Sequence, residues 1–339
     1  MLPKNIAALV EPPLTCARVV SQDRGSYLVV SNSVSVDRPI RAEISGSLRH
    51  GAYIATDFPV VGDYVAIKTN DGATIIDRIL PRKNLFARRA VDGSSELQPI
   101  ATNLDTLFIA VAANKDFNLR RLERYVIAAA SCNIPYAVVL TKCDLTACAD
   151  ELVDEIKTVA QGPVLKLSAH DGTGLGLLAP FCGASKTIAF VGSSGVGKST
   201  LINCLLESET LAVNDIRQQD HRGRHTTTRR FLQQLPDGTA IIDTPGMREL
   251  ALADAESGVG EVFAEIAQLA AQCRFRDCLH GSEPGCAVRE SMVETTYSSW
   301  RKLSKEAAYE TRKHDREAAA LEKAKWKAIH KANRERIAK

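Results

Sequence analysis

Hydrophobic and polar positions between about Cys16 and Ile79 follow the pattern of short strands. The segments are rich in β-branched residues, alternate in part, and are separated by Gly, Asn and Asp. Five such strands in about 70 residues predict a small closed β-barrel, for which the oligonucleotide-binding (OB) fold is the natural candidate. A barrel that only packs against its neighbour is the alternative, because a fold alone does not specify a ligand. The next stretch, 81–99, has basic residues and Gly-Ser and is interpreted as a linker.

The middle of the chain, from about 100 to 252, alternates apolar runs with segments of helical periodicity. This order predicts an α/β domain with a mainly parallel sheet and helices on both faces. Most of the runs are apolar throughout, as expected for strands buried on both faces. The expected strands are 106–112, 136–140, 164–167, 187–191 and 239–242, and the expected helices are 119–131, 149–161 and 198–207.

The last part of the chain is expected to be helical from about residue 258, with an interruption at the cysteine-rich stretch 273–286. Residues 297–339 are rich in Ala, Lys, Glu and Arg, which predicts a solvated helix rather than a core element. We therefore expect three domains: a barrel at 1–85, an α/β domain at 86–255, and an α-helical domain at 256–339 that ends in a basic helix.

The composition, 45% hydrophobic and 24% charged, is typical of a soluble globular protein. Apolar runs are far shorter than the roughly 20 residues of a membrane-spanning helix, and the first residues lack the pattern of a signal peptide. We expect a cytoplasmic protein with no membrane partner. The net charge is +3, yet residues 300–339 hold 13 Lys and Arg against 6 Asp and Glu. This tail could run along an RNA backbone, and a solvated charged helix is the alternative.

The pattern Gly-x4-Gly-Lys-Ser, between an apolar strand and a predicted helix, indicates a phosphate-binding loop. Its glycines let backbone N–H groups converge on phosphates, and the helix adds the positive end of its dipole. We expect Lys198 to reach the β and γ phosphates, and Ser199 and Asp243 to hold Mg²⁺. Gly246, in the Asp-Thr-Pro-Gly motif, can offer a backbone N–H to the γ phosphate. The predicted nucleotide-binding residues of the loop are Gly192, Ser193, Ser194, Gly195, Val196, Gly197, Lys198, Ser199 and Thr200.

ATPases and GTPases share this loop, so the residues that read the base must distinguish them. A Thr-Lys-Cys-Asp motif, with Thr141, Lys142 and Asp144, follows a predicted buried strand. Guanine presents adjacent N1–H and N2–H donors, and the single carboxylate of Asp144 can accept both. The aliphatic stem of Lys142 can cover the face of the purine.

A Ser-Ala-His motif, with Ser168, Ala169 and His170, follows the next predicted strand. A backbone N–H of this motif can donate to guanine O6 and thereby reject the amino group of adenine. All these motifs lie at strand ends of one α/β unit, where such sheets bind ligands. Their joint occurrence favours a GTPase.

Nine cysteines, odd in number and scattered, do not form a disulfide framework. Cys273, Cys278, His280 and Cys286 offer three thiolates and one imidazole, a set suited to one closed, structural Zn²⁺ site. Unrelated reduced thiols are the alternative for this cluster. The other cysteines are interpreted as isolated reduced thiols: Cys16, Cys132, Cys143, Cys148, Cys182 and Cys204.

The base-reading motifs precede the phosphate loop, whereas ordinary small GTPases have the reverse order, so the GTPase domain is interpreted as circularly permuted. The chain resembles the family of ribosome small-subunit-dependent GTPase A (RsgA) over nearly its whole length. The resemblance rests on the permuted motifs, the segment Gly-Arg-His-Thr-Thr-Thr that ends at Thr228, the barrel and the Cys/His cluster. It implies an OB-fold barrel, a permuted GTPase and a zinc-binding helical domain. It also implies late maturation of the small ribosomal subunit, which stimulates hydrolysis.

Met247 occupies the position where many GTPases carry the glutamine that orients the attacking water. His225 is the candidate to replace it, because a neutral imidazole can accept a proton from water, and the resemblance supports this residue. A surface histidine in a mobile loop is the alternative. We expect Thr227, rather than Thr226 or Thr228, to complete the Mg²⁺ shell.

Two functions are therefore compared. The first is a monomeric GTPase, stimulated by the small ribosomal subunit, that binds GTP and GDP and contacts rRNA. Basic residues expected to face this rRNA include Arg222, Arg224, Arg229 and Arg230. The second is a GTP-controlled RNA-binding switch with negligible turnover. Such a protein needs no water-orienting glutamine, so methionine at position 247 would be consistent with it.

Overall fold

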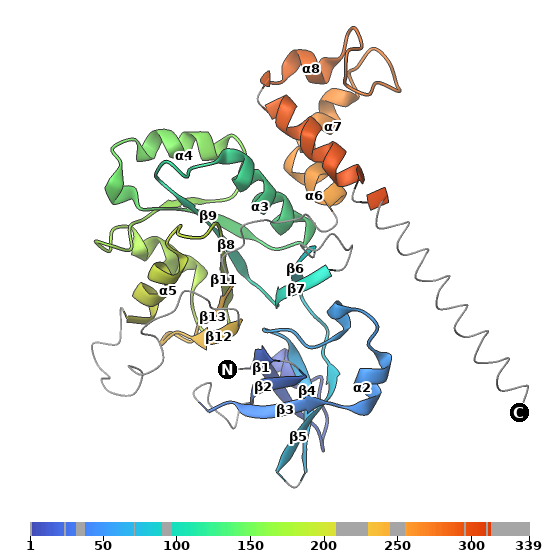
Figure 1. Ribbon diagram of the computed structural model, residues 1–339, viewed down its shortest axis with the longest axis vertical. Coiled ribbons are helices and arrows are strands. Elements are labelled where there is room, and N and C mark those ends of the chain that lie inside the picture. Colours follow the sequence, from blue (N-terminus) through green and yellow to red (C-terminus); the bar gives the residue numbers. More distant parts are fainter. Residues whose placement is uncertain are drawn as a thin grey trace, which may run out of the picture.

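The computed structural model describes residues 2–23, 25–31, 38–70, 72–89, 97–207, 230–244, 255–294, 296–309 and 311–312 of the chain. The described elements form three groups in Figure 1: a barrel, an α/β unit, and a set of helices next to helix α3. In these ranges no helix is long and apolar enough to cross a membrane.

The barrel consists of β1 (Thr15–Asp23), β2 (Ser26–Ser31), β3 (Ile40–Ile44), β4 (Tyr64–Asn70) and β5 (Ala73–Ile79). These strands pair in the order β1-β2-β3-β5-β4, and β4 also pairs with β1, which closes the sheet. Alternate side chains such as Val19, Val29, Val65 and Ile76 fill the interior. The expected five-stranded OB-fold barrel is confirmed. Short helices accompany it: α1 (Lys4–Ala7), α2 (Gly46–Gly51) and the 3-10 turn η1 (Ala55–Asp57).

The interpretation of 81–99 as a linker is wrong. Strands β6 (Leu85–Arg89) and β7 (Leu97–Thr102) form an antiparallel two-stranded sheet. Phe86 and Ile100 are almost fully buried in the main core, and their burial outweighs the loop-like composition of the residues between the strands.

The α/β unit confirms the five expected strands, each to within one residue at its ends. Its strands are β8 (Thr106–Ala112), β9 (Tyr136–Thr141), β10 (Val164–Lys166), β11 (Thr187–Val191), β12 (Phe231–Gln234) and β13 (Ala240–Asp243). The order is β10-β9-β8-β11-β13-β12, parallel except for β12, which sequence analysis did not predict. Every residue of β11 is buried, as its apolar run indicates.

Helices cover both faces of this sheet (Figure 1). The helices are α3 (Leu119–Ser131), α4 (Ala149–Lys157) and α5 (Lys198–Glu207), with short 3-10 segments η2 (Cys143–Leu145) and η3 (Leu175–Phe181). Ile109 packs in the core with α3, whereas Phe108 packs on the opposite face with Leu201 of α5. Helix α4 was expected to reach residue 161 but ends four residues earlier. Thr158 there donates its hydroxyl to the carbonyl of Glu155, a local bond that competes with helix continuation.

The C-terminal group contains α6 (Ala255–Val262), α7 (Ala264–Ala270), α8 (Ala287–Ser291) and a helical stretch at 296–309. The stretch 296–309 is the described beginning of the tail helix that we expected at 297–339. The expectation of a solvated helix outside the core is wrong for this described part, because Tyr297, Leu303 and Ala307 are buried in the main core. Residues 313–339 lie outside the described ranges. The expected three-part fold is confirmed, while the exact boundaries between its domains stay a prediction.

The C-terminal group packs against helix α3 of the α/β unit. The buried carboxylate of Glu123 accepts a hydrogen bond from the Ser299 hydroxyl, and Arg124 pairs with Glu306 at 2.6 Å. Burial raises the pKa of Glu123, and the bond from Ser299 opposes that rise. Helix α6 approaches α3 closely at Gly258, where a Cβ would lie 2.5 Å from the carbonyl oxygen of Ile127.

The barrel contacts the α/β unit through a buried cation on β1. Arg18 is 7% exposed, and its guanidinium donates to the hydroxyl of Thr187 at 2.7 Å and to the carbonyl of Gly62 at 3.3 Å. It also lies 4.9 Å from the ring centroid of Tyr64. Burial lowers the pKa of Arg18, and Tyr64 and nearby carboxylates oppose this. Because Thr187 begins β11, this cation ties the barrel to the strand that leads into the phosphate loop.

Arg18→Met should lower the free energy of unfolding by about 2 kcal/mol, because methionine fills much of the space but leaves two buried oxygens without their donor. Urea denaturation followed by circular dichroism measures the change. Arg78→Met is the matched control, since Arg78 pairs with Asp77 at the surface, and it should cost less than about 0.5 kcal/mol. Equal losses in the two variants would contradict the role assigned to Arg18.

Candidate nucleotide site and metal centre

The loop between β11 and α5 depends on glycine at position 192. Gly192 has φ 149°, and a Cβ there would lie 2.5 Å from the carbonyl oxygen of Ala110 on β8. No side chain fits at this distance without moving the backbone. The motif glycine is therefore explained by the close passage of the loop over β8.

Backbone donors are available along this loop. In the part of the chain that the structure describes, the N–H groups of Ser194, Gly195 and Gly197 have no acceptor. The first turn of α5 adds further N–H groups, because helix starts leave their donors without intrahelical partners. Ser199 and Thr200 are exposed on that turn. This arrangement can bind a phosphate group, as the sequence predicts.

Lys198 lies buried at the start of α5, 7% exposed. Its Nζ donates to the carbonyl oxygens of Gly192 and Ser193, each at 2.8 Å. Burial lowers the pKa of Lys198 to about 8, with an opposing effect from Asp243 at the end of β13. Burial likewise raises the pKa of Asp243, against the effect of Lys198. The cation and the carboxylate thus face a common region at the ends of β11 and β13.

The base-reading loop after β9 is bonded directly to the phosphate loop. The hydroxyl of Thr141 donates to the carbonyl of Val196 at 2.6 Å, and Nζ of Lys142 donates to the carbonyl of Gly195 at 2.8 Å. Lys142 adopts φ 60°, a left-handed conformation that turns the chain after the strand. The structure therefore brings together two motifs that are about 50 residues apart in the sequence.

Two groups for reading a base remain available beside this junction. The carboxylate of Asp144 is exposed and has no partner among the described residues. In the Ser-Ala-His turn, the hydroxyl of Ser168 accepts from the N–H of His170 at 3.2 Å and of Asp171 at 3.4 Å. The N–H of Ala169 is left without an acceptor in the described part of the chain. A carboxylate acceptor and an N–H donor complement the edge of guanine.

One contact in this region was missed by sequence analysis. Cys204, interpreted as an isolated thiol, is a free cysteine, but its thiol donates to the carbonyl of Ala169 at 3.2 Å. The bond links α5 to the Ser-Ala-His turn. In the sequence, the only indication of this contact is that Cys204 lies six residues after Lys198 on the same predicted helix.

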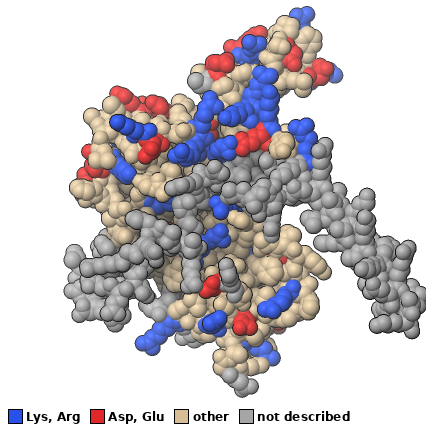
Figure 2. Space-filling view, in the orientation of Figure 1, with Lys and Arg blue, Asp and Glu red and all other residues tan. Residues whose placement is uncertain are grey.

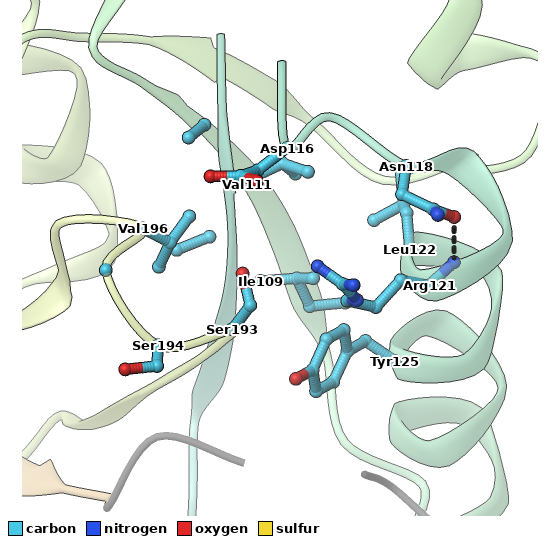
Figure 3. A pocket seen from close by; sticks show the side chains of 13 residues that line it. Ile109, Val111, Asp116, Asn118, Arg121, Leu122, Tyr125, Ser193, Ser194 and Val196 are labelled. Carbon is cyan, nitrogen blue, oxygen red and sulfur yellow. Dashed lines mark hydrogen bonds between the residues drawn. The ribbon is translucent and has the colours of Figure 1, made fainter. Parts of the chain in front are cut away.

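A cavity lies between the phosphate loop and the start of α3 (Figure 3). Arg121 and Tyr125 extend from α3 toward Ser193, and the side chain of Asn118 caps the helix by accepting from the N–H of Arg121 at 3.0 Å. Burial raises the pKa of Tyr125 to about 12, with an opposing effect from Arg121. No sequence motif marks Arg121 and Tyr125, because single polar residues on a helix have no characteristic spacing.

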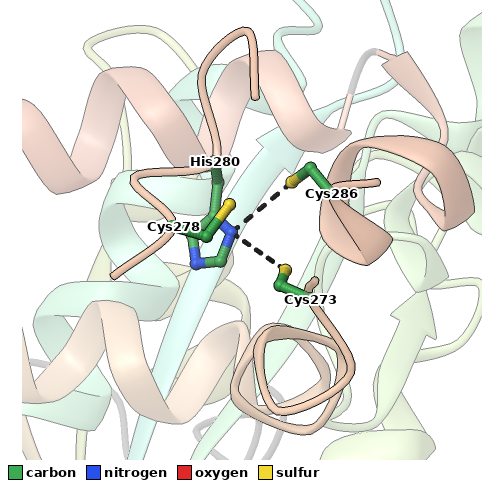
Figure 4. Close-up of side chains that lie close together, drawn as sticks. All are labelled: Cys273, Cys278, His280 and Cys286. Atoms are coloured by element: carbon green, nitrogen blue, oxygen red, sulfur yellow. Dashed lines mark hydrogen bonds between the residues drawn. The ribbon is translucent and has the colours of Figure 1, made fainter. Parts of the chain in front are cut away.

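The four predicted metal ligands converge in the C-terminal group (Figure 4). Their ligand atoms all lie within 4.8 Å of one another. Nδ1 of His280 is 3.5 Å from Sγ of both Cys273 and Cys286. A tetrahedral ion with bonds of about 2.0–2.3 Å places its ligand atoms about 3.3–3.8 Å apart, so these side chains fit one metal ion.

The backbone around the cluster is held in place by several bonds. Glu283 accepts from the N–H groups of Leu279 and Gly281, and the hydroxyl of Tyr297 donates to the carbonyl of His280. Cys286 is 1% exposed and immediately precedes α8. Four protein ligands, one buried and three half-buried, with these supports suit a closed structural site rather than a catalytic one.

Several predicted residues lie outside the described ranges. These are His225, Thr226, Thr227, Thr228, Gly246 and Met247, together with Arg222, Arg224 and Arg229. Arg230 is described, and its guanidinium donates to the carbonyl of Pro99 on β7 at 2.6 Å. Burial lowers its pKa, and neighbouring Arg88 lowers it further.

The chain is similar in sequence to proteins of a known family. A model of the RsgA GTPase family matches residues 79–253. A protein of Opitutus terrae named small ribosomal subunit biogenesis GTPase RsgA is 42% identical, over 88% of this chain and 86% of that protein. RsgA 2 of Lactiplantibacillus plantarum, with the same name, is 43% identical over 86% of this chain and 83% of that protein.

Solved structures agree with the fold. The crystal structure of YjeQ from Thermotoga maritima has 25% identity and a TM-score of 0.63, covering 86% of this chain and 98% of that chain. YloQ, titled a circularly permuted GTPase, has 24% identity and a TM-score of 0.61, covering 88% of this chain and 96% of that chain.

The purified protein should hold one divalent metal ion per chain, and Cys278→Ser should lower both the metal content and the free energy of unfolding, the latter by more than about 2 kcal/mol. Elemental analysis and denaturation with and without a chelator measure these effects. Cys148→Ser, at an exposed free cysteine, is the control and should change neither. A metal-free protein of unchanged stability would contradict the structural role.

Proposed function

The chain belongs to the RsgA GTPase family and is a GTP hydrolase, and from this we propose that it acts in late maturation of the small ribosomal subunit, which stimulates its hydrolysis of GTP. Relatives that are 42% and 43% identical over most of the chain are named for biogenesis of that subunit. The observation that carries the GTP-binding part of the proposal is the bonding of the base-reading loop to the phosphate loop through Thr141 and Lys142.

Guanine is read by two groups in this proposal. The carboxylate of Asp144 accepts from N1–H and N2–H, and the N–H of Ala169 donates to O6. Neither the carboxylate of Asp144 nor the N–H of Ala169 has a partner among the described residues, which supports this assignment. The stem of Lys142 covers the purine while its ammonium stays on the carbonyl of Gly195.

The phosphates lie against the N–H groups of the loop and the start of α5. Lys198 leaves the carbonyls of Gly192 and Ser193 for the phosphate oxygens, whose charge favours its protonated form. Mg²⁺ supplies positive charge to the β and γ phosphates. Ser199 and Asp243 of this chain are its candidate ligands, with Thr227 as a third, and Gly246 is assigned to the γ phosphate.

His225 is the proposed base for the attacking water, since Met247 has no hydrogen-bonding group for that purpose. The proposal rests on the family pattern around Gly-Arg-His-Thr-Thr-Thr and on imidazole chemistry. Because Met247 cannot orient the water, contact with the small subunit is proposed to stimulate the reaction.

RNA contact is proposed for a basic surface on the C-terminal side. Figure 2 shows Lys and Arg gathered over α3 and the neighbouring C-terminal helices. Exposed basic residues on these elements are Arg120, Arg121, Arg301, Lys302 and Lys305. Neutralising phosphates with such residues releases counterions, so binding to the subunit would weaken as salt rises. The ion in the Cys/His cluster is proposed to be Zn²⁺, which prefers thiolate and imidazole ligands.

The experiment is a measurement of GTP hydrolysis with and without purified small ribosomal subunits. Strong stimulation is expected. A rate that stays flat and negligible would instead support the alternative, a GTP-controlled RNA-binding switch.

His225→Ala should keep GTP binding but lower stimulated turnover about 100-fold or more, the range for loss of a general base. His221→Ala, a histidine in the same segment, is the matched control and should retain most of the turnover. Unchanged turnover in His225→Ala would remove the catalytic assignment.

A further inference from the structure

The first residue of the base-reading motif is Thr141, whose side chain differs in its donors from the other small polar side chain that could bond here, asparagine. An asparagine amide carries two N–H groups, whereas a threonine hydroxyl carries one O–H. An asparagine can therefore bond a backbone carbonyl and a base at the same time. A threonine can donate to only one of them at a time.

The distances around Thr141 indicate which acceptor its hydroxyl donates to. Its hydroxyl lies 2.6 Å from the carbonyl of Val196 in the phosphate loop and 3.2 Å from the carbonyl of Val111 at the end of β8. Both neighbours are pure acceptors, so the hydroxyl is the donor to them. The short distance assigns the proton to Val196.

Burial confirms that this side chain is directed into the protein. Thr141 is 2% exposed, and its hydroxyl would be 3.9 Å from a Cβ placed on Gly197. Turning the hydroxyl toward a ligand would leave the carbonyl of Val196 without this donor and would break one of the two bonds between the loops. Such a loss is unfavourable for a buried acceptor.

Guanine offers two acceptors on the edge beyond its N1–H, namely O6 and N7. O6 is assigned to the N–H of Ala169 in the proposed function, on which this inference rests. From the occupied hydroxyl of Thr141 we propose that residue 141 gives no hydrogen bond to N7, and that this GTPase binds guanine nucleotides without reading N7. Thr141 is thus a positioning residue that holds the base-reading loop on the phosphate loop.

The test compares GDP with 7-deaza-GDP, in which N7 is replaced by a C–H group and O6, N1–H and N2–H are kept. Calorimetric titration of the full-length protein should give dissociation constants that agree within about twofold, since no neutral hydrogen bond is lost. A 7-deaza-GDP affinity about tenfold weaker than that of GDP would overturn the proposal, because N7 would then be read by another donor.

Thr141→Asn supplies the missing donor. This variant should prefer GDP over 7-deaza-GDP by about 3- to 10-fold, the usual effect of one neutral hydrogen bond. A variant that binds GDP but shows no such preference would contradict the geometry assigned to residue 141.

Thr141→Val is the matched control, because valine has nearly the same shape and no hydroxyl. It should weaken GDP and 7-deaza-GDP by the same factor, through loss of the bond to Val196, and leave their ratio unchanged. A change in the ratio would show that the wild-type hydroxyl does contact N7. ADP binding separates this inference from the proposed function: wild-type protein that binds ADP as well as GDP would refute guanine recognition itself, whatever the result with 7-deaza-GDP.

Discussion

The two hydrogen bonds from the base-reading loop to the phosphate loop are the interaction on which the nucleotide site depends. Thr141 and Lys142 each donate to a carbonyl of the phosphate loop, and the two acceptors belong to the adjacent residues Val196 and Gly195. A nucleotide has to place its base and its phosphates at a fixed separation. Because these bonds set the distance between the two loops, they decide whether one ligand can reach both.

Strand order explains why the permuted sequence still forms this site. Strands β9, β8 and β11 are neighbours and parallel, so their C-terminal ends lie at one edge of the sheet. The order of the motifs along the chain does not change which strand ends meet at that edge. Permutation changes only how the strands are connected. The barrel attaches to this unit through the bond from Arg18 on β1 to Thr187 of β11. The C-terminal helices attach to it through Glu123 and Arg124 on α3.

Local sequence predicted the strands and most helices of the α/β unit because their apolar runs are buried on both faces or along one stripe. The Cys/His cluster was also predicted, since four ligands of suitable chemistry lie within 14 residues. The hairpin at Phe86 and Ile100 was missed because its stability comes from a distant core rather than from its own pattern. Arg18 and Cys204 were missed for a related reason: their partners are remote in sequence, and one arginine or one thiol carries no periodic signal.

Guanine recognition by Asp144 is the central claim, and xanthine nucleotides test it most directly. Xanthine carries an oxygen where guanine has its N2 amino group, so a carboxylate suits guanine and an amide suits xanthine. Affinities of wild type and Asp144→Asn should be measured for GDP and XDP. We predict that wild type prefers GDP by about 100-fold or more, and that Asp144→Asn reverses the preference. An unchanged preference in the variant would contradict the account.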